Sequence, residues 1–293
     1  MACSNADSNI LTALASQLRL SATLEINELI QRRVANGHKV VHLGFGEATF
    51  PIQPNVVAAH RQASDITSYL PVAGLMKLRE VCIVAMAKHF VCKSIANFQS
   101  RRLNYTISPH QVIVAPGSKP LLFALLDILQ GDVLLPRPSW VSYEPQILHA
   151  SKRVFWVETD EVDRHTITES SLEMAFQRGV SEGGNPQVML INSPSNPTGQ
   201  AFNHHNIDTI TNFCQRHNIT LISDEIYSDI SFSKEYSATP CSGSKFNDNR
   251  KILTGGLSKV NSFLGRDWQR WCMSNKIIDL FCRGLENRLC DFP

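Results

Sequence analysis

The stretch QVMLINSPSNPTGQ at residues 187–200, followed by IDTITNFCQRH at 207–217 and ITLISDEI at 219–226, decides the fold of this 293-residue chain. A short apolar run, an amphipathic run of helical length and a second apolar run follow one another here. This order is typical of a β-α-β unit. Because strands joined by a crossover helix are parallel, the stretch predicts a parallel sheet with helices packed against it.

The same alternation continues on both sides of that stretch, over most of residues 111–256. The other expected strands are QVIVA at 111–115, DVLL at 132–135, RVFWVE at 153–158 and KILTGG at 251–256. The helical runs between them include KPLLFALLDIL at 119–129, a run after Trp140 and SSLEMAFQRG at 170–179. The sequence therefore predicts an α/β fold, with a mostly parallel sheet and helices on both of its faces. Before residue 111, we expect a helix over Leu24–Val34, a short strand over Lys39–Leu43 and a helix from about Gly74 to Phe90.

Composition and charge argue against several classes of protein. The 28 Lys and Arg residues and the 26 Asp and Glu residues leave a net charge of +2 and are scattered, unlike those of a nucleic-acid surface. No apolar run reaches the roughly 18 residues of a membrane span. The first ten residues, MACSNADSNI, lack the basic and apolar regions of a signal peptide. We therefore expect a cytoplasmic protein with neither nucleic acid nor membrane as a partner.

The sequence also lacks the usual motifs for metals and nucleotides. Its eight cysteines form no C-x-x-C pair, and the adjacent His204 and His205 cannot share one face of a helix. Neither the P-loop pattern nor the G-x-G-x-x-G fingerprint occurs. These observations argue against a metal site and against P-loop or Rossmann nucleotide binding.

Ligands of open α/β sheets bind at the carboxyl ends of the strands, so the residues after each run are candidates for a site. After QVIVA, Gly117 and Ser118 open a helix whose first N–H groups would attract phosphate, although a plain tight turn is the commoner explanation. Trp140 follows DVLL in a proline-rich turn, where its ring would either cover a flat ligand or pack in the core.

Three more strand ends carry polar side chains, namely Asn196 after QVMLIN, Asp224 and Tyr227 after ITLIS, and Lys259 after KILTGG. Each has an ordinary explanation when taken alone, such as a helix cap for Asp224 or a solvated surface position for Lys259. Taken together, these groups suit a phosphorylated pyridine aldehyde. The amine would bind it as a Schiff base, the carboxylate would keep the ring nitrogen protonated and the helix start would hold the phosphate.

At this point the chain resembles a fold-type I, pyridoxal 5'-phosphate-dependent aminotransferase of class I/II. The segments that carry the resemblance are LGFGEATFP (43–51), SYLPVAGLMKLRE (68–80), APGSKPLLFALL (115–126), PRPSWVSYEPQ (136–146), INSPSNPTGQ (191–200), ISDEIYSDISF (222–232) and TGGLSK (254–259). Each segment is a weak signal alone, but the ordered set over residues 24–265 is highly specific.

The resemblance implies a role for each residue around the cofactor ring. Lys259 would carry the cofactor as a Schiff base and move the proton of the substrate's α-carbon. Asp224 would pair with the ring nitrogen, and Trp140 would stack on the ring. Asn196 and Tyr227 would form hydrogen bonds with its phenolic oxygen.

The remaining implied contacts involve the phosphate, the substrate and a second subunit. The phosphate ligands would be Gly117, Ser118, Lys119, Ser258 and Arg266. Tyr69 would reach the phosphate of the partner subunit, which implies a homodimer with shared sites. Gly46 would lie beside the substrate.

The activity that the resemblance implies is a ping-pong transamination, in which an amino group passes from an amino acid to a 2-oxo acid through the Schiff base. Two alternatives stay open at this point. One is a pyridoxal-phosphate-dependent lyase or synthase of the same fold, which would perform elimination chemistry. The other is a catalytically silent isoform that pairs with full-length subunits.

The sequence departs from the family near its carboxyl end. The family places an arginine two residues after a glycine to bind the phosphate, whereas here Gly265 is followed by Arg266 and Asp267. Family members continue for on the order of 100 further residues, which form most of a small domain, and the tail 267–293 resembles none of this. We therefore expect a truncated product whose C-terminal small domain is largely missing. The expected divisions are an N-terminal segment 1–45 on the small-domain side, a cofactor-binding large domain 46–266 and an atypical tail 267–293.

Overall fold

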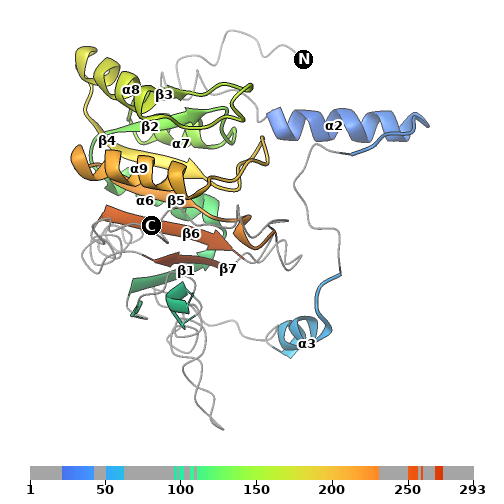
Figure 1. Cartoon of the computed structure of the whole chain (residues 1–293). Coiled ribbons are helices and arrows are strands. Elements are labelled where there is room, and N and C mark those ends of the chain that lie inside the picture. The colour runs from blue at the N-terminus through green and yellow to red at the C-terminus, as the bar shows by residue number, and fades with distance from the viewer. Residues whose placement is uncertain are drawn as a thin grey trace, which may run out of the picture.

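The computed structural model describes residues 22–42, 51–62, 96–97, 99–101, 106–108, 111–230, 250–256, 259 and 268–272. Seven strands in these residues form one sheet in the order β1-β7-β6-β5-β4-β2-β3 (Figure 1). The strands are β1 Val112–Pro116, β2 Asp132–Arg137, β3 Val154–Glu158, β4 Pro186–Asn192, β5 Thr220–Asp224, β6 Lys251–Gly256 and β7 Trp268–Cys272. Every pairing among β2, β3, β4, β5 and β6 is parallel, as the alternation of the sequence predicted.

Helices cover both faces of the sheet, which confirms the predicted fold class. They are α6 Ser118–Ile128, α7 Tyr143–His149, α8 Glu169–Ser181 and α9 His204–Arg216. The buried cluster on one face includes Leu122 of α6 and Ile147 of α7. The cluster on the other face includes Leu172 of α8 and Phe213 of α9. The sheet is therefore the middle layer of three, and its strands are buried between two apolar cores.

Strand β4 illustrates how the sequence produces these two cores. Val188 and Leu190 belong to the cluster beneath α6 and α7, while Met189 and Ile191 belong to the cluster beneath α8 and α9. Successive side chains of a strand point to opposite faces, so a strand that is covered on both sides needs a continuous apolar run. The run VMLI supplies it, and none of these four side chains is more than 1% exposed.

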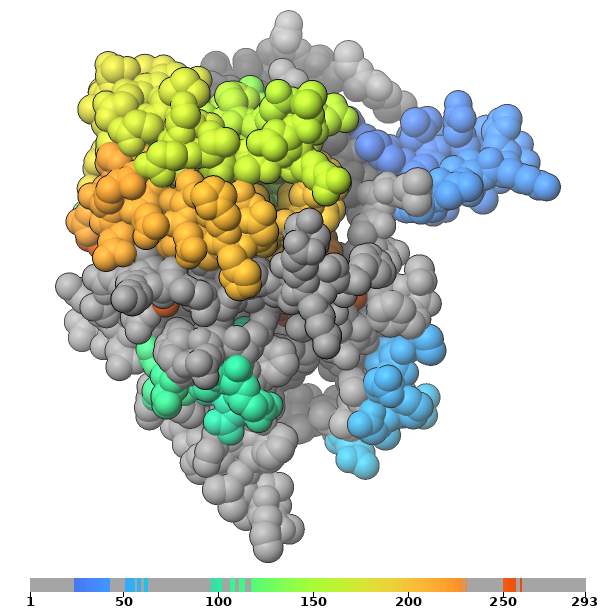
Figure 2. All heavy atoms as spheres, viewed as in Figure 1, coloured from blue at the N-terminus to red at the C-terminus, as the bar shows by residue number. Residues whose placement is uncertain are grey.

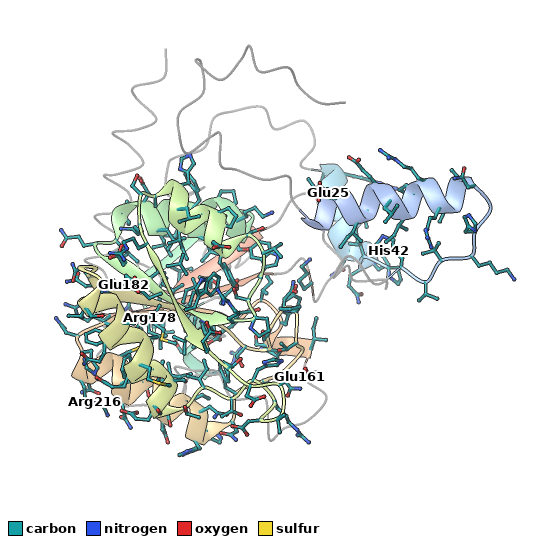
Figure 3. All side chains as sticks on the ribbon, turned by 90° about the horizontal axis from the view of Figure 1, so that it is seen from above. Glu25, His42, Glu161, Arg178, Glu182 and Arg216 are labelled. Atoms are coloured by element: carbon teal, nitrogen blue, oxygen red, sulfur yellow. The ribbon has the colours of Figure 1, made fainter. Side chains whose placement is uncertain are left out.

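Helices α8 and α9 lie on the surface of the molecule (Figure 2). Arg178, Glu182 and Arg216 extend outward there (Figure 3). Arg178 donates a hydrogen bond of 3.0 Å to the backbone carbonyl of Trp156, which fastens α8 to β3. Arg216 forms an ion pair with Glu169, which joins α9 to the first turn of α8. Each helix thus has the apolar inner face that its sequence pattern predicts, while the exposed residues of α8 include Met174 and Val180 besides its charged side chains.

Strand β7 is an element that the sequence did not predict. It pairs antiparallel with β1 on one side and with β6 on the other, so residues beyond 266 complete the sheet. An antiparallel neighbour needs no crossover helix, and it therefore falls outside the strand–helix rhythm. The sequence WQRWC is also interrupted by two polar residues, unlike the continuous apolar runs of the parallel strands.

The N-terminal predictions have a mixed outcome. Helix α2, Ala22–Ala35, confirms the helix expected over Leu24–Val34, and a further helix, α3, covers Pro54–Gln62. The strand expected over Lys39–Leu43 is wrong for its described part, because residues 39–42 belong to no strand. The helix expected from Gly74 to Phe90 lies outside the described residues. Within the described part of the chain, no helix is both long enough and apolar enough to cross a bilayer.

Candidate active site at the carboxyl edge of the sheet

Asp224 is the last residue of β5 and lies at the centre of a buried hydrogen-bonded group. The register places it beside Asn192 of β4 and Thr254 of β6. Tyr143, from the first turn of α7, donates its phenolic hydroxyl to one carboxylate oxygen of Asp224 at 2.8 Å. The Thr254 hydroxyl donates to the other carboxylate oxygen, also at 2.8 Å. Both oxygens of a carboxyl group that is only 3% exposed are therefore held in place.

The electrostatics of this group favour a positively charged partner. Burial raises the pKa of the Asp224 carboxyl, while the bonds from Tyr143, Thr254 and the backbone N–H of Ile226 oppose that rise. Burial, and then the charge of Asp224, raise the pKa of Tyr143 well above its ordinary value, so its hydroxyl stays protonated and keeps donating. None of the ion pairs within the described residues involves Asp224. A protonated ring nitrogen would supply the missing charge.

Asn196 and Tyr227, which the sequence predicted to share one ligand atom, come together in the structure. The side-chain amide of Asn196 lies 3.5 Å from the Tyr227 hydroxyl, and both residues are half-buried. Burial raises the pKa of Tyr227, the bond from Asn196 opposes that rise and the charge of Asp224 adds to it. The two side chains therefore present an amide donor and a protonated hydroxyl close to Asp224.

The predicted phosphate cradle lies at the start of α6. Gly117 occupies the cap position with a φ of 90° and makes no side-chain cap bond, and the first turn of α6 contains no acidic residue. A helix start of this kind directs N–H groups and the positive end of the helix dipole toward an anion. Ser118 and Lys119 are the first two residues of α6, and their contacts with a phosphate stay predictions.

Trp140 packs in the core, which is one of the two roles that the sequence left open, while stacking on a ligand stays a prediction. Its ring is half-buried and packs against the α6–α7 core, and it contacts the Tyr143 ring edge-on at 5.2 Å. The ammonium group of Lys119 lies 5.0 Å from the centre of the same ring. Trp140 is thus held between the start of α6 and the Tyr143–Asp224 pair, where a flat ligand can lie against its exposed part.

Lys259 is half-buried and follows the end of β6 by three residues. Since Thr254 of β6 bonds to Asp224, the chain leaves β6 toward the same edge of the sheet that carries the carboxylate. The other predicted site residues, Tyr69, Ser258, Arg266 and Gly46, lie outside the described residues.

The sequence analysis did not identify Tyr143, Thr254 or Asn192 as site residues. Tyr143 and Thr254 lie in segments that carried the family resemblance. Their local sequence, however, does not distinguish a side chain that donates a hydrogen bond to a carboxylate from one that only packs in the core. The signal was the strand register: Asn192 and Thr254 stand beside Asp224 in neighbouring strands. A strand order worked out from the sequence would have brought these two residues to the site.

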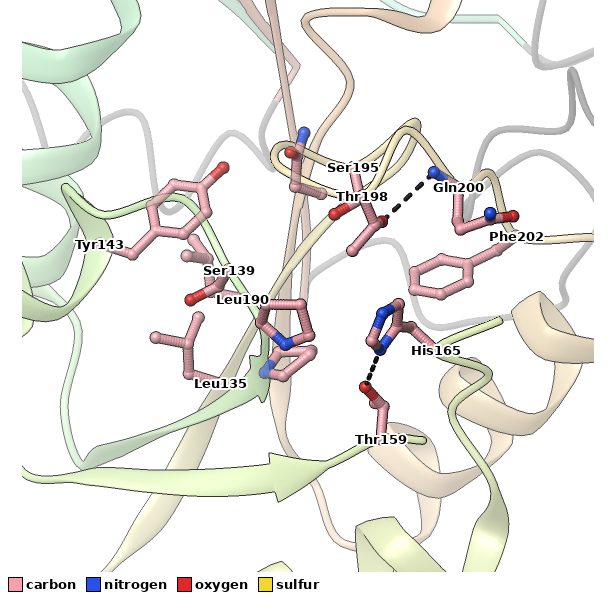
Figure 4. Close-up of a pocket in the computed structure, with 13 residues that line it drawn as sticks. Leu135, Ser139, Tyr143, Thr159, His165, Leu190, Ser195, Thr198, Gln200 and Phe202 are labelled. Atoms are coloured by element: carbon pink, nitrogen blue, oxygen red, sulfur yellow. Dashed lines mark hydrogen bonds between the residues drawn. The ribbon is translucent and has the colours of Figure 1, made fainter. Parts of the chain in front are cut away.

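A small cavity adjoins Tyr143 on the side of β2 and β4 (Figure 4). His165, whose ring nitrogen lies 3.0 Å from the Thr159 hydroxyl, forms part of its wall with Ser195 and Thr198. The cavity has a volume of about 30 Å³, which is room for about two water molecules.

A model of the class I and II aminotransferases matches residues 38–266. The chain belongs to this family. Curated relatives include aspartate aminotransferases of Geobacillus stearothermophilus, 31% identical, and Bacillus subtilis, 29% identical; each comparison covers 85% of this chain and 60% of the relative. The aminotransferase chain described here thus spans about 60% of the length of these relatives.

Solved structures agree with this assignment. The crystal structure of the aspartate aminotransferase of Thermotoga maritima superimposes with a TM-score of 0.79 at 27% identity, over 95% of this chain and 70% of the other. The superposition covers more of the chain than the family match does, in keeping with the place of β7 within the sheet. These relatives do not favour the lyase or the silent-isoform alternative.

Aminotransferases of this family use pyridoxal 5'-phosphate, and the described residues fit that group. Asp224 offers a buried carboxylate for a ring nitrogen, and the Asn196–Tyr227 pair offers hydrogen bonds for a phenolic oxygen. Gly117, which carries no Cβ, leaves space for a phosphate at the start of α6. No group of three or more histidine, cysteine, aspartate or glutamate residues that could hold a metal ion occurs within the described ranges.

Proposed function

We propose that this chain is the cofactor-binding part of an aminotransferase that moves an amino group between an amino acid and a 2-oxo acid. One observation carries the proposal. Asp224 is buried, both of its carboxylate oxygens accept hydrogen bonds, and it lies at the edge of the sheet where β6 ends, three residues before Lys259. A carboxylate held in this way suits a pyridinium nitrogen, and an amine nearby suits an aldehyde.

When bound, pyridoxal 5'-phosphate supplies an electron sink for the charge that develops at the substrate's α-carbon. Asp224 would hold a proton at the ring nitrogen, and Tyr143 and Thr254 keep its two oxygens in place for that task. Asn196 and Tyr227 would form hydrogen bonds with the phenolic oxygen, while Trp140 would orient the ring by stacking. Lys259 would bind the cofactor covalently and move the proton of the substrate's α-carbon.

The phosphate would lie at the start of α6, against the backbone N–H groups of Gly117, Ser118 and Lys119. Ser258 and Arg266 remain proposed ligands of the same phosphate. Tyr69 would reach the phosphate of the partner subunit, and Gly46 would contact the substrate. A homodimer with shared sites and a cytoplasmic location belong to the same proposal.

The relatives are named aspartate aminotransferases, which makes aspartate the first amino donor to test. The division into segments 1–45, 46–266 and 267–293 also remains a proposal. The position of β7 suggests moving the last boundary, because residues 268–272 belong to the central sheet.

The test combines cofactor capture with a transfer assay. The purified chain is incubated with pyridoxal 5'-phosphate, reduced with borohydride and digested, and the modified lysine is located by mass spectrometry. We expect the label on Lys259 in the wild type and no label in Lys259→Ala. Lys152→Ala is the matched control: Lys152 is half-buried, its pKa is lowered chiefly by burial, and it is therefore a natural competitor for an aldehyde.

A second assay measures oxo-acid formation from aspartate, with and without an oxo-acid acceptor. Transamination requires the acceptor for turnover beyond one equivalent, whereas elimination chemistry does not. Label spread over several lysines, or product formation that ignores the acceptor, would contradict the proposal.

A further inference from the structure

Asn192 joins two residues that the proposed function assigns to the cofactor ring. It is the last residue of β4, is 9% exposed and stands beside Asp224 in the parallel register of β4 and β5. Its side-chain amide nitrogen donates to the backbone carbonyl of Asp224 at 2.8 Å. Its side-chain oxygen accepts from the backbone N–H of Asn196 at 2.7 Å. One short side chain therefore bridges the strand that carries the carboxylate and the loop that carries the amide.

The loop of residues 193–200 is called the Asn196 loop below. Apart from the bond to Asn192, several of its hydrogen bonds join residues of the loop to one another. The N–H of Ser195 donates to the carbonyl of Gln200 at 2.8 Å, and the N–H of Gly199 donates to the carbonyl of Ser195 at 2.7 Å. At its base, the N–H of Ser193 reaches the carbonyl of Asp224 at 3.2 Å. The Asn192 bond acts at Asn196 itself and is much shorter than the 3.5 Å contact between Asn196 and Tyr227. It therefore fixes the backbone from which the Asn196 side chain extends.

The chemistry of this bridge is specific to asparagine. The bridge needs a donor and an acceptor on opposite sides of one planar group, at the end of a single-carbon stem. Aspartate would keep the acceptor but would turn an oxygen toward the Asp224 carbonyl. Alanine would remove both bonds and leave the partly buried N–H of Asn196 without its acceptor.

We propose that Asn192 is a positioning residue, which holds the Asn196 loop at a fixed distance from Asp224 so that both side chains meet one cofactor ring. This inference rests on the proposed function. It differs from a purely structural role because it acts on the cofactor through Asn196. A donor to the phenolic oxygen stabilises the deprotonated form of that oxygen, so losing the donor raises the pH at which the bound cofactor changes its absorbance.

The experiment is a double-mutant cycle on the full chain with pyridoxal 5'-phosphate bound. The variants are Asn192→Ala, Asn196→Ala and the double variant, and the readouts are the pH midpoint of the cofactor absorbance and the dissociation constant of the cofactor. Asn206→Ala is the matched control, because Asn206 is a buried asparagine, 6% exposed, whose side-chain oxygen accepts from Asn203 at the start of α9, outside the proposed site. Asn192→Asp serves as a second variant, which retains the acceptor for Asn196.

We expect Asn192→Ala to raise the midpoint by about one pH unit and to weaken cofactor binding about tenfold, the size expected for one buried hydrogen bond. The double variant should match Asn196→Ala rather than show the sum of the two effects, because residues that act through one another are not additive. Asn206→Ala should leave both readouts unchanged. Asn192→Asp should shift the midpoint less than Asn192→Ala does.

Additive shifts in the double variant, or a midpoint in Asn192→Ala equal to that of the wild type, would overturn the inference while leaving the proposed function intact. A wild-type chain that takes up no cofactor would overturn the proposed function and this inference with it. Should Asn192→Ala fail to fold, Asn192→Leu, which removes both bonds and nearly preserves the side-chain volume, replaces it in the comparison with Asn196→Ala.

Discussion

Removing the Tyr143 hydroxyl tests the buried group around Asp224 without disturbing the core. Tyr143→Phe keeps the ring, which is 1% exposed and packs edge-on against Trp140. It removes only the 2.8 Å hydrogen bond to the Asp224 carboxylate. Thr254 and the Ile226 N–H remain as donors to that carboxylate, so the substitution isolates one bond to one charged group.

The size of the effect depends on pH. Burial raises the folded-state pKa of Asp224 above its unfolded value of about 3.9. Below the unfolded value, the neutral carboxyl group makes its full contribution to the stability of the folded chain. This contribution is lost as the pH rises through the folded-state pKa. Above the folded-state pKa, Tyr143 donates to a charged group, and losing this hydrogen bond costs about 1.5–3 kcal/mol of stability. Below the unfolded value, the bond joins two neutral groups, and losing it costs about 0.5–1.5 kcal/mol.

The assay is urea unfolding of the cofactor-free chain at two pH values: about pH 3.5, below the unfolded value of the Asp224 carboxyl, and a second pH above its folded-state transition, which is located from the pH dependence of wild-type stability. Tyr227→Phe is the matched control, because within the described residues its hydroxyl makes only the 3.5 Å contact with Asn196. We expect Tyr143→Phe to lose about 2 kcal/mol at the higher pH and about 1 kcal/mol at the lower, with an unchanged denaturant slope. Equal losses at the two pH values, or an equal loss in Tyr227→Phe, would refute the assignment of Asp224 as a buried carboxylate held by Tyr143.

Two further predictions concern the start of α6 and the core. Gly117→Ala should destabilise the chain by about 1–3 kcal/mol, because its φ of 90° and ψ of 147° lie in a region that is essentially restricted to glycine. It should also weaken cofactor binding. Gly183→Ala, at a φ of 71° with open space around it, should also cost stability but should leave cofactor binding unchanged. Cofactor binding that survives Gly117→Ala would argue against a phosphate at this helix start. Cys214 is fully buried, and burial raises the pKa of its thiol. Iodoacetamide should therefore modify Cys214 only in denaturant, which peptide mass spectrometry can measure. Labelling of Cys214 in the native chain would contradict the packing of α9.

The sequence predicted the elements whose local pattern and tertiary environment agree. The run VMLI of β4 is continuous because both faces of the strand are buried, and it is recognised for that reason. Strand β7 shows the opposite case, since its sequence WQRWC has no such run and its antiparallel pairing follows no crossover rule. Lys39–Leu43 has a strand-like composition, but its described residues 39–42 belong to no strand. Short apolar runs are ambiguous when judged by their pattern alone.

The candidate site was predicted in its residues more than in its contacts. Asp224, Asn196 and Gly117 were identifiable because each follows an apolar run, where α/β sheets bind their ligands. The bond from Tyr143 to Asp224 joins residues 81 positions apart, and nothing in the local sequence of α7 indicates which hydroxyl reaches the carboxylate. The same holds for Asn192, whose two bonds depend on the strand register and on the path of the loop that follows.

The most direct test of the account is a crystal structure of the full chain with pyridoxal 5'-phosphate. We expect continuous density between the Lys259 side chain and the cofactor, with the ring nitrogen within about 3 Å of the Asp224 carboxylate. A cofactor bound elsewhere, with Asp224 contacting only Tyr143, Thr254 and the Ile226 N–H, would contradict it.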